Sequence, residues 1–166
     1  MFGTPPQGRA DYAFIQHIFA SMKPGSGRCA ILLPHGVLFR DEERTIRENL
    51  IRSNLLECVI GLAPNLFYNA PMEACIMICR TSKPAVLRDK VLFINAVAEA
   101  TRKSGQSFLD EQHIQKIANA YDGKVDVPYF AHIASIDEIE SNNYSLSIPL
   151  YVEKEPTPGD TRTLQE

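Results

Sequence analysis

The sequence predicts an α/β fold, and two observations carry this prediction. Segments whose apolar residues recur at helical spacing alternate with short, continuous apolar runs that are typical of buried strands. Their order is helix, strand, helix, strand, loop, strand, which favours helices packed on a largely parallel sheet. The first expected element is a helix, whereas a doubly wound sheet starts with several βα units. We therefore expect the later half of such a sheet, whose first strand lacks a neighbour in this chain.

Two helices are expected in the first third of the chain. The first begins near Asp11, a candidate N-cap, and ends at the Pro/Gly segment 23–27. Its apolar residues are Phe14, Ile15, Ile18, Phe19 and Met22. The second begins at the acidic residues 41–43, which suit the positive end of the helix dipole. Its buried stripe is Ile46, Leu50 and Ile51.

Four apolar runs are predicted to be strands: Cys29–Leu33, Leu56–Gly61, Ala74–Cys79 and Val91–Ile94. We expect the first to be buried on both faces of a parallel sheet, because its apolar residues are continuous. The third returns after a loop at 63–71 that contains Pro, Asn, Phe and Tyr. From about residue 97 the chain is more polar, with short helices expected at 113–121 and 137–140 and a disordered tail at 153–166.

Bulk composition narrows the functional classes. The 166 residues are 45% hydrophobic and 22% charged, which is the composition and size of one globular domain. The net charge is −3, so any contact with DNA phosphates is local or is supplied by a partner. No apolar run has the length of a membrane span, and the N-terminus has no signal-peptide pattern. We therefore expect a cytoplasmic protein with no membrane partner.

No metal site or disulfide is predicted. The four cysteines, at positions 29, 58, 75 and 79, lie in strand-like runs and are expected to be reduced core thiols. Four residues of a strand span roughly 13 Å, too far for Cys75 and Cys79 to share a disulfide or a zinc ion. No histidine has ligand-like spacing with Cys, Asp or Glu. The arginines at 40, 44, 47 and 52 alternate with glutamates, which favours a solvated helix face over a DNA-binding stripe.

Five stretches, in this order, resemble the modification subunit of type I restriction–modification systems, an N6-adenine DNA methyltransferase family. They are ADYAFIQHIFASMKPG (10–25), AILLPHGVLFR (30–40), VIGLAPNLFYNAPMEACIMICR (59–80), KVLFINA (90–96) and NNYSLSIPLYV (142–152). The resemblance implies that residues 1–96 are the C-terminal half of a class I S-adenosylmethionine-dependent methyltransferase domain with a Rossmann-like sheet. A small α+β extension at 97–152 would follow it.

The same resemblance implies an S-adenosylmethionine cofactor and three partners: DNA, a DNA-specificity subunit and a restriction subunit with nuclease and translocase functions. The family's glycine-rich donor loop and its catalytic Asn-Pro-Pro-Phe tetrapeptide do not occur in this sequence, so no catalytic residue is assigned in this chain. The stretch Thr4-Pro5-Pro6-Gln7 is no substitute, because Thr and Gln stand where the motif has Asn and Phe. We expect the chain alone to bind no S-adenosylmethionine and to be inactive.

The loop at 63–71 holds the candidate contacts to the target base. An enzyme of this family must extrude the adenine from the duplex and hold it by stacking and hydrogen bonds. The resemblance places this loop where adenine methyltransferases present an aromatic side chain to that base. Asn65, Phe67 and Tyr68 are therefore predicted to contact the base or the DNA. The alternative for the two aromatics is a hydrophobic plug under the loop.

Two further pairs of residues are expected near the active site. Asp11 and Tyr12 open the first helix, which the resemblance places near the donor or the base; the alternative is an N-cap and an exposed aromatic. His35 and Gly36 follow a strand at its C-terminal edge, where ligand sites of α/β proteins lie. The imidazole could act as a general base. The alternative is a loop histidine beside a glycine with positive φ.

Three functional hypotheses follow. The chain is part of a site-specific DNA adenine methyltransferase, or a non-catalytic, truncated interaction module that docks to restriction–modification partners, or a class I methyltransferase fragment that acts on RNA or protein. The Asn-Leu-Phe-Tyr loop and the length of the match argue against the third. An unpaired apolar edge at the strand 29–33 further predicts that the isolated chain self-associates.

Overall fold

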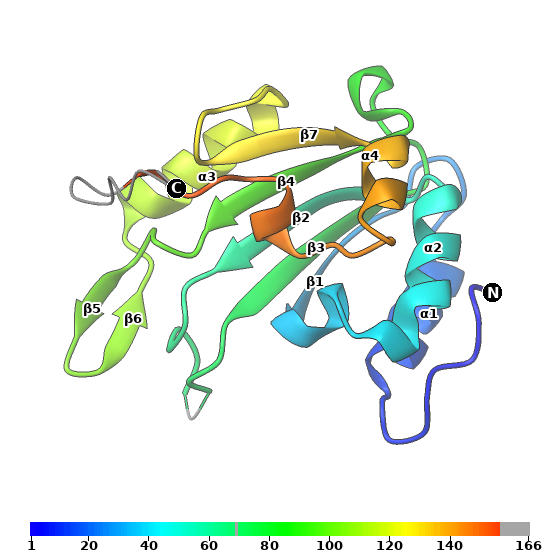
Figure 1. The fold of residues 1–166 in the computed structure, drawn as a ribbon, viewed down its shortest axis with the longest axis horizontal. Coiled ribbons are helices and arrows are strands. Elements are labelled where there is room, and N and C mark those ends of the chain that lie inside the picture. The colour runs from blue at the N-terminus through cyan, green and yellow to red at the C-terminus, as the bar shows by residue number, and fades with distance from the viewer. Residues whose placement is uncertain (69, 157–166) are drawn as a thin grey trace, which may run out of the picture.

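The computed structural model describes residues 1–68 and 70–156 and confirms the α/β prediction (Figure 1). A five-stranded sheet has the order β1-β3-β2-β4-β7. Its strands are β1 (Arg28–Pro34), β2 (Leu56–Leu62), β3 (Ala74–Arg80), β4 (Lys90–Ala96) and β7 (Ala131–Ser135). The helices are α1 (Asp11–Ser21), α2 (Arg44–Arg52), α3 (Glu111–Gly123) and α4 (Ile136–Ser141). A separate hairpin joins β5 (Thr101–Lys103) to β6 (Gln106–Phe108).

Strands β1, β2 and β4 run in the same direction. β3 lies between β1 and β2 and is antiparallel to both, β4 is parallel to β2, and β7 is antiparallel to β4. The carboxyl ends of β1, β2 and β4 therefore meet at one edge of the sheet, here called the C-terminal edge (Figure 1). Ligand sites of α/β proteins lie at this kind of edge.

The central strand β2 is buried at all of its residues, as its apolar run predicts. Because successive side chains of a strand point to opposite faces, β2 contributes to two apolar clusters. Val59 packs in the cluster that contains the buried residues of α1 and α2, whereas Cys58 and Ile60 pack in the cluster that contains Ala120 of α3. The sheet is thus the middle layer between two groups of helices.

Strand β1 differs from the prediction that both of its faces are buried in a parallel sheet. It is the edge strand of the described sheet and pairs antiparallel with β3, from Arg28 opposite Arg80 to Pro34 opposite Ala74. On one face of the sheet the covering helix α3 packs on β4, which β3 and β2 separate from β1. This face of β1 is therefore left open. The Leu32 side chain on β1 is accordingly 50% exposed.

The extension at 97–152 shares the sheet and core of the preceding residues. β7 pairs with β4, and the Tyr151 ring stacks on Phe93 of β4 with ring centroids 4.0 Å apart. α3 and α4 confirm the two short helices, whereas β7 and the β5–β6 hairpin are absent from the predicted elements. Residues 153–156 have no regular secondary structure, and the rest of the predicted tail, 157–166, lies outside the described residues.

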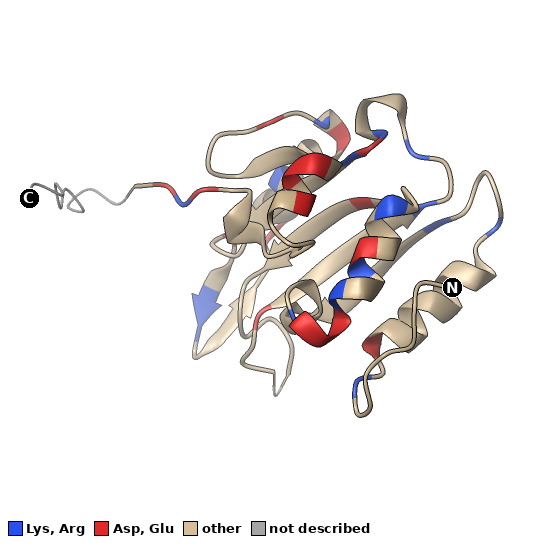
Figure 2. Cartoon of the chain, turned by 45° about the vertical axis from the view of Figure 1, so that its right-hand side comes forward, with Lys and Arg blue, Asp and Glu red and all other residues tan. Residues whose placement is uncertain are grey.

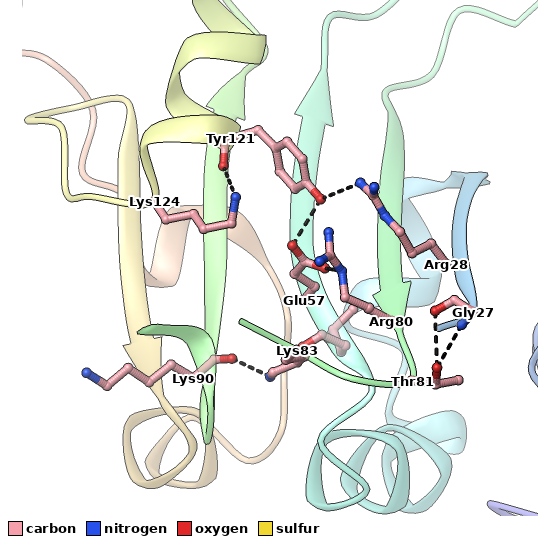
Figure 3. Close-up of polar contacts among 10 residues, drawn as sticks. Gly27, Arg28, Glu57, Arg80, Thr81, Lys83, Lys90, Tyr121 and Lys124 are labelled. Atoms are coloured by element: carbon pink, nitrogen blue, oxygen red, sulfur yellow. Dashed lines mark hydrogen bonds and ion pairs between the residues drawn. The ribbon is translucent and has the colours of Figure 1, made fainter. Parts of the chain in front are cut away.

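A buried ion network crosses the sheet near the edge opposite to the C-terminal edge (Figure 3). The fully buried Glu57 of β2 has its Oε2 2.8 Å from Nε of Arg80 on β3. Its Oε1 accepts a hydrogen bond from the Tyr121 hydroxyl at 3.0 Å. Because Tyr121 belongs to α3, the network ties this helix to both strands.

A lysine joins the starts of two parallel strands near this network. Lys83 Nζ donates hydrogen bonds to the carbonyl oxygens of Leu56 at 2.8 Å and Lys90 at 2.6 Å, which begin β2 and β4 (Figure 3). Burial of the ammonium group lowers the pKa of Lys83 to about 8. A neutral amine still has two N–H groups, so both hydrogen bonds survive deprotonation.

Candidate functional site

Three segments gather at the C-terminal edge of the sheet (Figure 1). A short 3-10 helix, His35–Leu38, follows β1; the loop 63–71 follows β2; and the β5–β6 hairpin follows β4. Because these strands are parallel, segments that are far apart in the sequence become neighbours. Candidate residues from all three segments therefore share one side of the molecule.

The first pocket at this edge contains three of the predicted residues. It has a volume of about 610 Å³ and is lined by Arg9, Asp11, Pro34, His35, Gly36, Phe39, Arg40, Met72 and Glu73. The start of α1 and the end of β1 are thus brought together around one cavity.

Two ion pairs of Arg40 and a histidine–carboxylate contact hold the walls of the first pocket. Arg40 Nη2 lies 2.7 Å from Asp11 Oδ2, and Arg40 Nε lies 3.0 Å from Oε2 of Glu43. Burial raises the pKa of the Glu43 carboxyl group. On the other wall, His35 Nδ1 lies 3.1 Å from Glu73 Oε2, which joins the end of β1 to the residue before β3. These contacts fix the polar walls of the pocket before any ligand enters.

Two of the alternative roles considered for these residues are wrong. Ala10, rather than Asp11, is the N-cap of α1; Asp11 is the first helical residue, and its carboxylate is drawn to Arg40. Gly36 lies in the 3-10 helix and is not among the residues with positive φ. A Cβ atom built at Gly36 would meet the flexible Arg40 side chain at 3.4 Å, so the backbone does not require glycine there.

Tyr12 is a core residue, neither the exposed aromatic nor the donor or base contact considered from the sequence. Its side chain is fully buried, and its hydroxyl donates a hydrogen bond to the Val37 carbonyl oxygen at 2.9 Å. Burial raises the pKa of Tyr12 above its ordinary range. Adjacent residues of a helix point about 100° apart, so Asp11 faces the pocket while Tyr12 faces the core. The structure gives Tyr12 no surface at which to touch the donor or the base.

The loop 63–71 exposes both of its predicted aromatic residues. The Tyr68 side chain is 87% exposed and the Phe67 side chain is 39% exposed. Asn65 holds a left-handed backbone conformation with φ of 59°, which asparagine tolerates better than most residues. The exposure of Tyr68 excludes a role as a hydrophobic plug in this chain, whereas Phe67 is partly covered.

A second pocket lies between this loop and the β5–β6 hairpin. It has a volume of about 430 Å³ and is lined by Asn65, Phe67, Tyr68, Ala70, Pro71, Ser104, Gly105 and Gln106. The consecutive residues Pro71 and Met72 line the second and the first pocket respectively, so the two pockets adjoin. The structure thus brings all of the predicted site residues except Tyr12 to two neighbouring cavities.

The hairpin is the element of this site that the sequence-based prediction missed. The Ser107 amide of β6 donates a hydrogen bond to the Asn65 carbonyl oxygen at 2.9 Å, which attaches the hairpin to the loop. The turn residues Ser104 and Gly105 both have positive φ, as a two-residue hairpin turn requires. This Ser-Gly pair was the available signal, but two strands of three residues each, in which only Phe108 is apolar, give no hydrophobic pattern.

The four cysteines are free thiols, of which Cys58, Cys75 and Cys79 are buried as predicted for core residues, whereas Cys29 is half-buried. Burial raises the pKa of Cys58 and Cys79 well above the ordinary value and that of Cys75 to about 12. Cys29 lies directly opposite Cys79 on the neighbouring strand, and a hydrogen bond from the Cys79 thiol lowers the pKa of Cys29 to about 7.

Residues 1–68 and 70–156 contain neither a metal-binding cluster nor a membrane-spanning helix. No group of three or more His, Cys, Asp or Glu side chains is arranged to hold a metal ion there. His113 instead belongs to the cap of α3, and His132 lies 3.1 Å from Glu138. In the same residues, every helix is too short or too polar to cross a bilayer.

Comparison with known proteins identifies relatives of this chain in sequence and in fold. Two type I restriction enzyme methylase subunits from Methanocaldococcus jannaschii, MjaVIII and MjaVII, are 36% and 35% identical to it over 156 residues. The alignments cover 92% and 90% of the chain but only 26% of either relative, so the chain spans about a quarter of their length.

Solved structures that resemble this chain also include type I restriction–modification methyltransferase subunits. A type I restriction–modification methyltransferase subunit from Streptococcus thermophilus is 40% identical with a TM-score of 0.86, covering 92% of this chain and 32% of that one. The EcoKI M protein has a TM-score of 0.72 at 17% identity, over 92% of this chain and 40% of that one, and supports the fold alone. A family model described as N-6 DNA Methylase matches residues 1–160. The resemblance seen in the sequence is therefore confirmed, and this chain belongs to the N-6 DNA methylase family, among the methylase subunits of type I restriction–modification systems.

Proposed function

We propose that the chain forms part of a site-specific DNA adenine N6-methyltransferase of a type I restriction–modification system, which transfers a methyl group from S-adenosylmethionine to adenine. One observation carries this proposal: in a chain of the N-6 DNA methylase family, the first pocket and the exposed aromatic loop adjoin at the C-terminal edge of the sheet. Ligand sites are expected at this edge. The names of the relatives, all type I methylase subunits, support the same assignment.

The target base is the ligand that we assign to the loop 63–71. An adenine extruded from the duplex leaves its stacking partners and needs a replacement surface. Tyr68 offers its ring to solvent, and Phe67 lies beside it in the wall of the second pocket. Stacking on an aromatic side chain stabilises a bound base by roughly 1–3 kcal/mol. Asn65, near the start of the loop, would contribute polar contacts.

The described residues do not fit the methyl donor. A donor site needs a glycine-rich turn after a strand, where the backbone can approach the ligand closely. The segments that follow the three parallel strands are His35-Gly36-Val37, Ala63-Pro64-Asn65 and Val97-Ala98-Glu99, which contain no Gly-x-Gly. We infer that other polypeptide supplies the donor loop and the Asn-Pro-Pro-Phe segment. The chain alone would then be inactive, with Asp11 and His35 shaping the pocket beside the reacting groups.

The proposed partners are DNA, a DNA-specificity subunit and a restriction subunit. One solved structure with the same fold concerns complex assembly in a type I restriction–modification system, which supports a multi-subunit setting for such folds. The alternative is a non-catalytic interaction module that docks to the same partners. This alternative is favoured by the missing donor loop, whereas the exposed aromatic loop favours a direct role at the base.

The experiment is a methyl-transfer assay on the chain alone and on the chain assembled with the polypeptides that complete its restriction–modification complex. We expect N6-methyladenine in DNA from the complex, none from the chain alone, and no saturable heat of S-adenosylmethionine binding to the chain. Methylation of another base, RNA or protein by the complex would contradict the proposal. An unchanged rate when the chain is left out would favour the interaction module.

A further inference from the structure

We infer that the β5–β6 hairpin binds the phosphate backbone of DNA beside the base that the loop 63–71 receives. This inference rests on the proposed function and adds a second DNA-binding element to it. The chain has a net charge of −3, so an electrostatic contact with DNA must come from a local group of cations. The hairpin supplies such a group at the C-terminal edge of the sheet.

The hairpin carries basic side chains and no acidic ones. Residues 101–108 read TRKSGQSF, and the strand β5 appears in blue at one corner of the molecule in Figure 2. Arg102 and Lys103 are both exposed. Successive strand residues point to opposite faces, so the two cations flank the hairpin. The major groove of DNA is wide enough for a two-stranded ribbon. A ribbon with a cation on each face can contact phosphates on both sides of that groove.

Neighbouring acids do not neutralise these two cations. Glu99 pairs with Lys116, and Asp110 caps α3 and accepts a hydrogen bond from the Thr101 hydroxyl. Among residues 1–68 and 70–156, Arg102 and Lys103 form no ion pair. Their charge is therefore directed to solvent, where it can attract a polyanion.

The hairpin is held in a fixed position relative to the aromatic loop. Ser107 is buried, and its amide is bonded to the Asn65 carbonyl oxygen. Lys103 lies directly opposite Gln106, which lines the second pocket together with Phe67 and Tyr68. A phosphate bound by the hairpin would thus lie next to the nucleotide whose base enters that pocket. The hairpin would position the strand while the loop holds the base.

The test compares DNA binding by the assembled methyltransferase carrying wild-type chain, R102A/K103A, or the control R88A/K90A. Arg88 and Lys90 are exposed cations at the opposite edge of the sheet, so the control removes the same charge from a different place. Dissociation constants for a target duplex are measured between about 50 and 200 mM salt, a range in which phosphate contacts weaken strongly. Thermal unfolding confirms that each variant folds.

We expect R102A/K103A to weaken DNA binding at least tenfold at low salt and to reduce the slope of log K against log salt by about two, because each phosphate contact contributes about 0.9. The control should keep the wild-type slope. An unchanged slope for R102A/K103A, in a complex whose wild type methylates adenine, overturns this inference alone. A wild-type complex that methylates no DNA adenine overturns the proposed function instead.

Discussion

The backbone amide of Ser107 and the carbonyl oxygen of Asn65 form a 2.9 Å hydrogen bond that joins the β5–β6 hairpin to the loop 63–71. The bond depends on the conformation of Asn65, whose φ of 59° lies in the left-handed region. Two elements that follow different strands, β4 and β2, are thereby held as one unit at the C-terminal edge. The geometry of this unit can be tested at Asn65.

Replacement of Asn65 by valine should destabilise the chain by about 1–2 kcal/mol, because a β-branched residue is strained at positive φ. Replacement by glycine should be close to neutral, since glycine adopts this conformation without strain. Urea unfolding of both variants measures the difference. Equal stability of N65V and N65G would show that the left-handed conformation of Asn65 does not hold in solution.

Replacement of Tyr68 by alanine should lower methylation by the assembled enzyme roughly 5- to 150-fold, which corresponds to the loss of 1–3 kcal/mol of base stacking. The stability of the chain should not change, because the side chain is 87% exposed. Steady-state kinetics on a target duplex measure the first effect and urea unfolding the second.

Phe67→Ala is the matched comparison for Tyr68. Phe67 is partly covered, so this variant should lose some stability as well as activity, whereas Y68A should lose activity alone. Wild-type methylation by Y68A would exclude Tyr68 from the contact with the base.

The contribution of Lys83 to the stability of the chain should rise between about pH 8 and 10, opposite in sign to that of the buried cysteines, whose raised pKa values make stability fall with pH. In the folded chain the pKa of Lys83 is lowered to about 8 by burial, while its ordinary value is 10.5. Over this interval Lys83 therefore binds more protons in the unfolded chain, so its own contribution to the free energy of unfolding increases with pH. The contribution is complete above the unfolded pKa and is lost as the pH falls through the folded pKa.

K83M should lower the slope of the unfolding free energy against pH relative to the wild type, because methionine cannot titrate and the contribution of Lys83 is lost. K90M, which removes an exposed lysine nearby, is the control and should keep the wild-type slope. Urea unfolding at several pH values measures both. An identical slope for K83M and wild type would show that Lys83 titrates normally in the fold.

The isolated chain should self-associate through β1. This edge strand is unpaired on its outer side within the described residues, and Leu32 exposes an apolar side chain beside that edge. L32K should reduce association, because a lysine on an edge strand opposes strand pairing between molecules. Light scattering across a concentration series measures the mass; a wild-type chain that stays monomeric at high concentration contradicts the prediction.

Elements with a strong apolar pattern could be predicted from the sequence. The helical spacing of Ile46, Leu50 and Ile51 identified α2, and the continuous run at 56–61 identified the central strand β2. The position of β1 at the edge of the sheet, with one face exposed, could not be predicted in the same way. Burial of a strand depends on what covers it, and an apolar run alone does not reveal whether the strand lies at the centre or the edge.

The candidate site was partly predictable for a similar reason. A strand followed by His35 and Gly36 pointed to the C-terminal edge, where these residues line one pocket together with Asp11. The burial of Tyr12 could not be predicted, because the orientation of adjacent residues depends on the helix phase relative to the core. Glu57, an acid within an apolar run, is a signal of a buried ion pair, but its partner Arg80 lies on another strand and could not be identified from spacing.

Photo-cross-linking tests the location of the DNA-facing surface most directly. The assembled methyltransferase is irradiated on a duplex that carries 5-iodouracil next to the target adenine, and the adducts are mapped by mass spectrometry. We predict adducts on peptides that contain residues 65–71 and 101–108 of this chain. Adducts confined to the opposite edge, around residues 81–90, or found only on the partner polypeptides, would contradict the account.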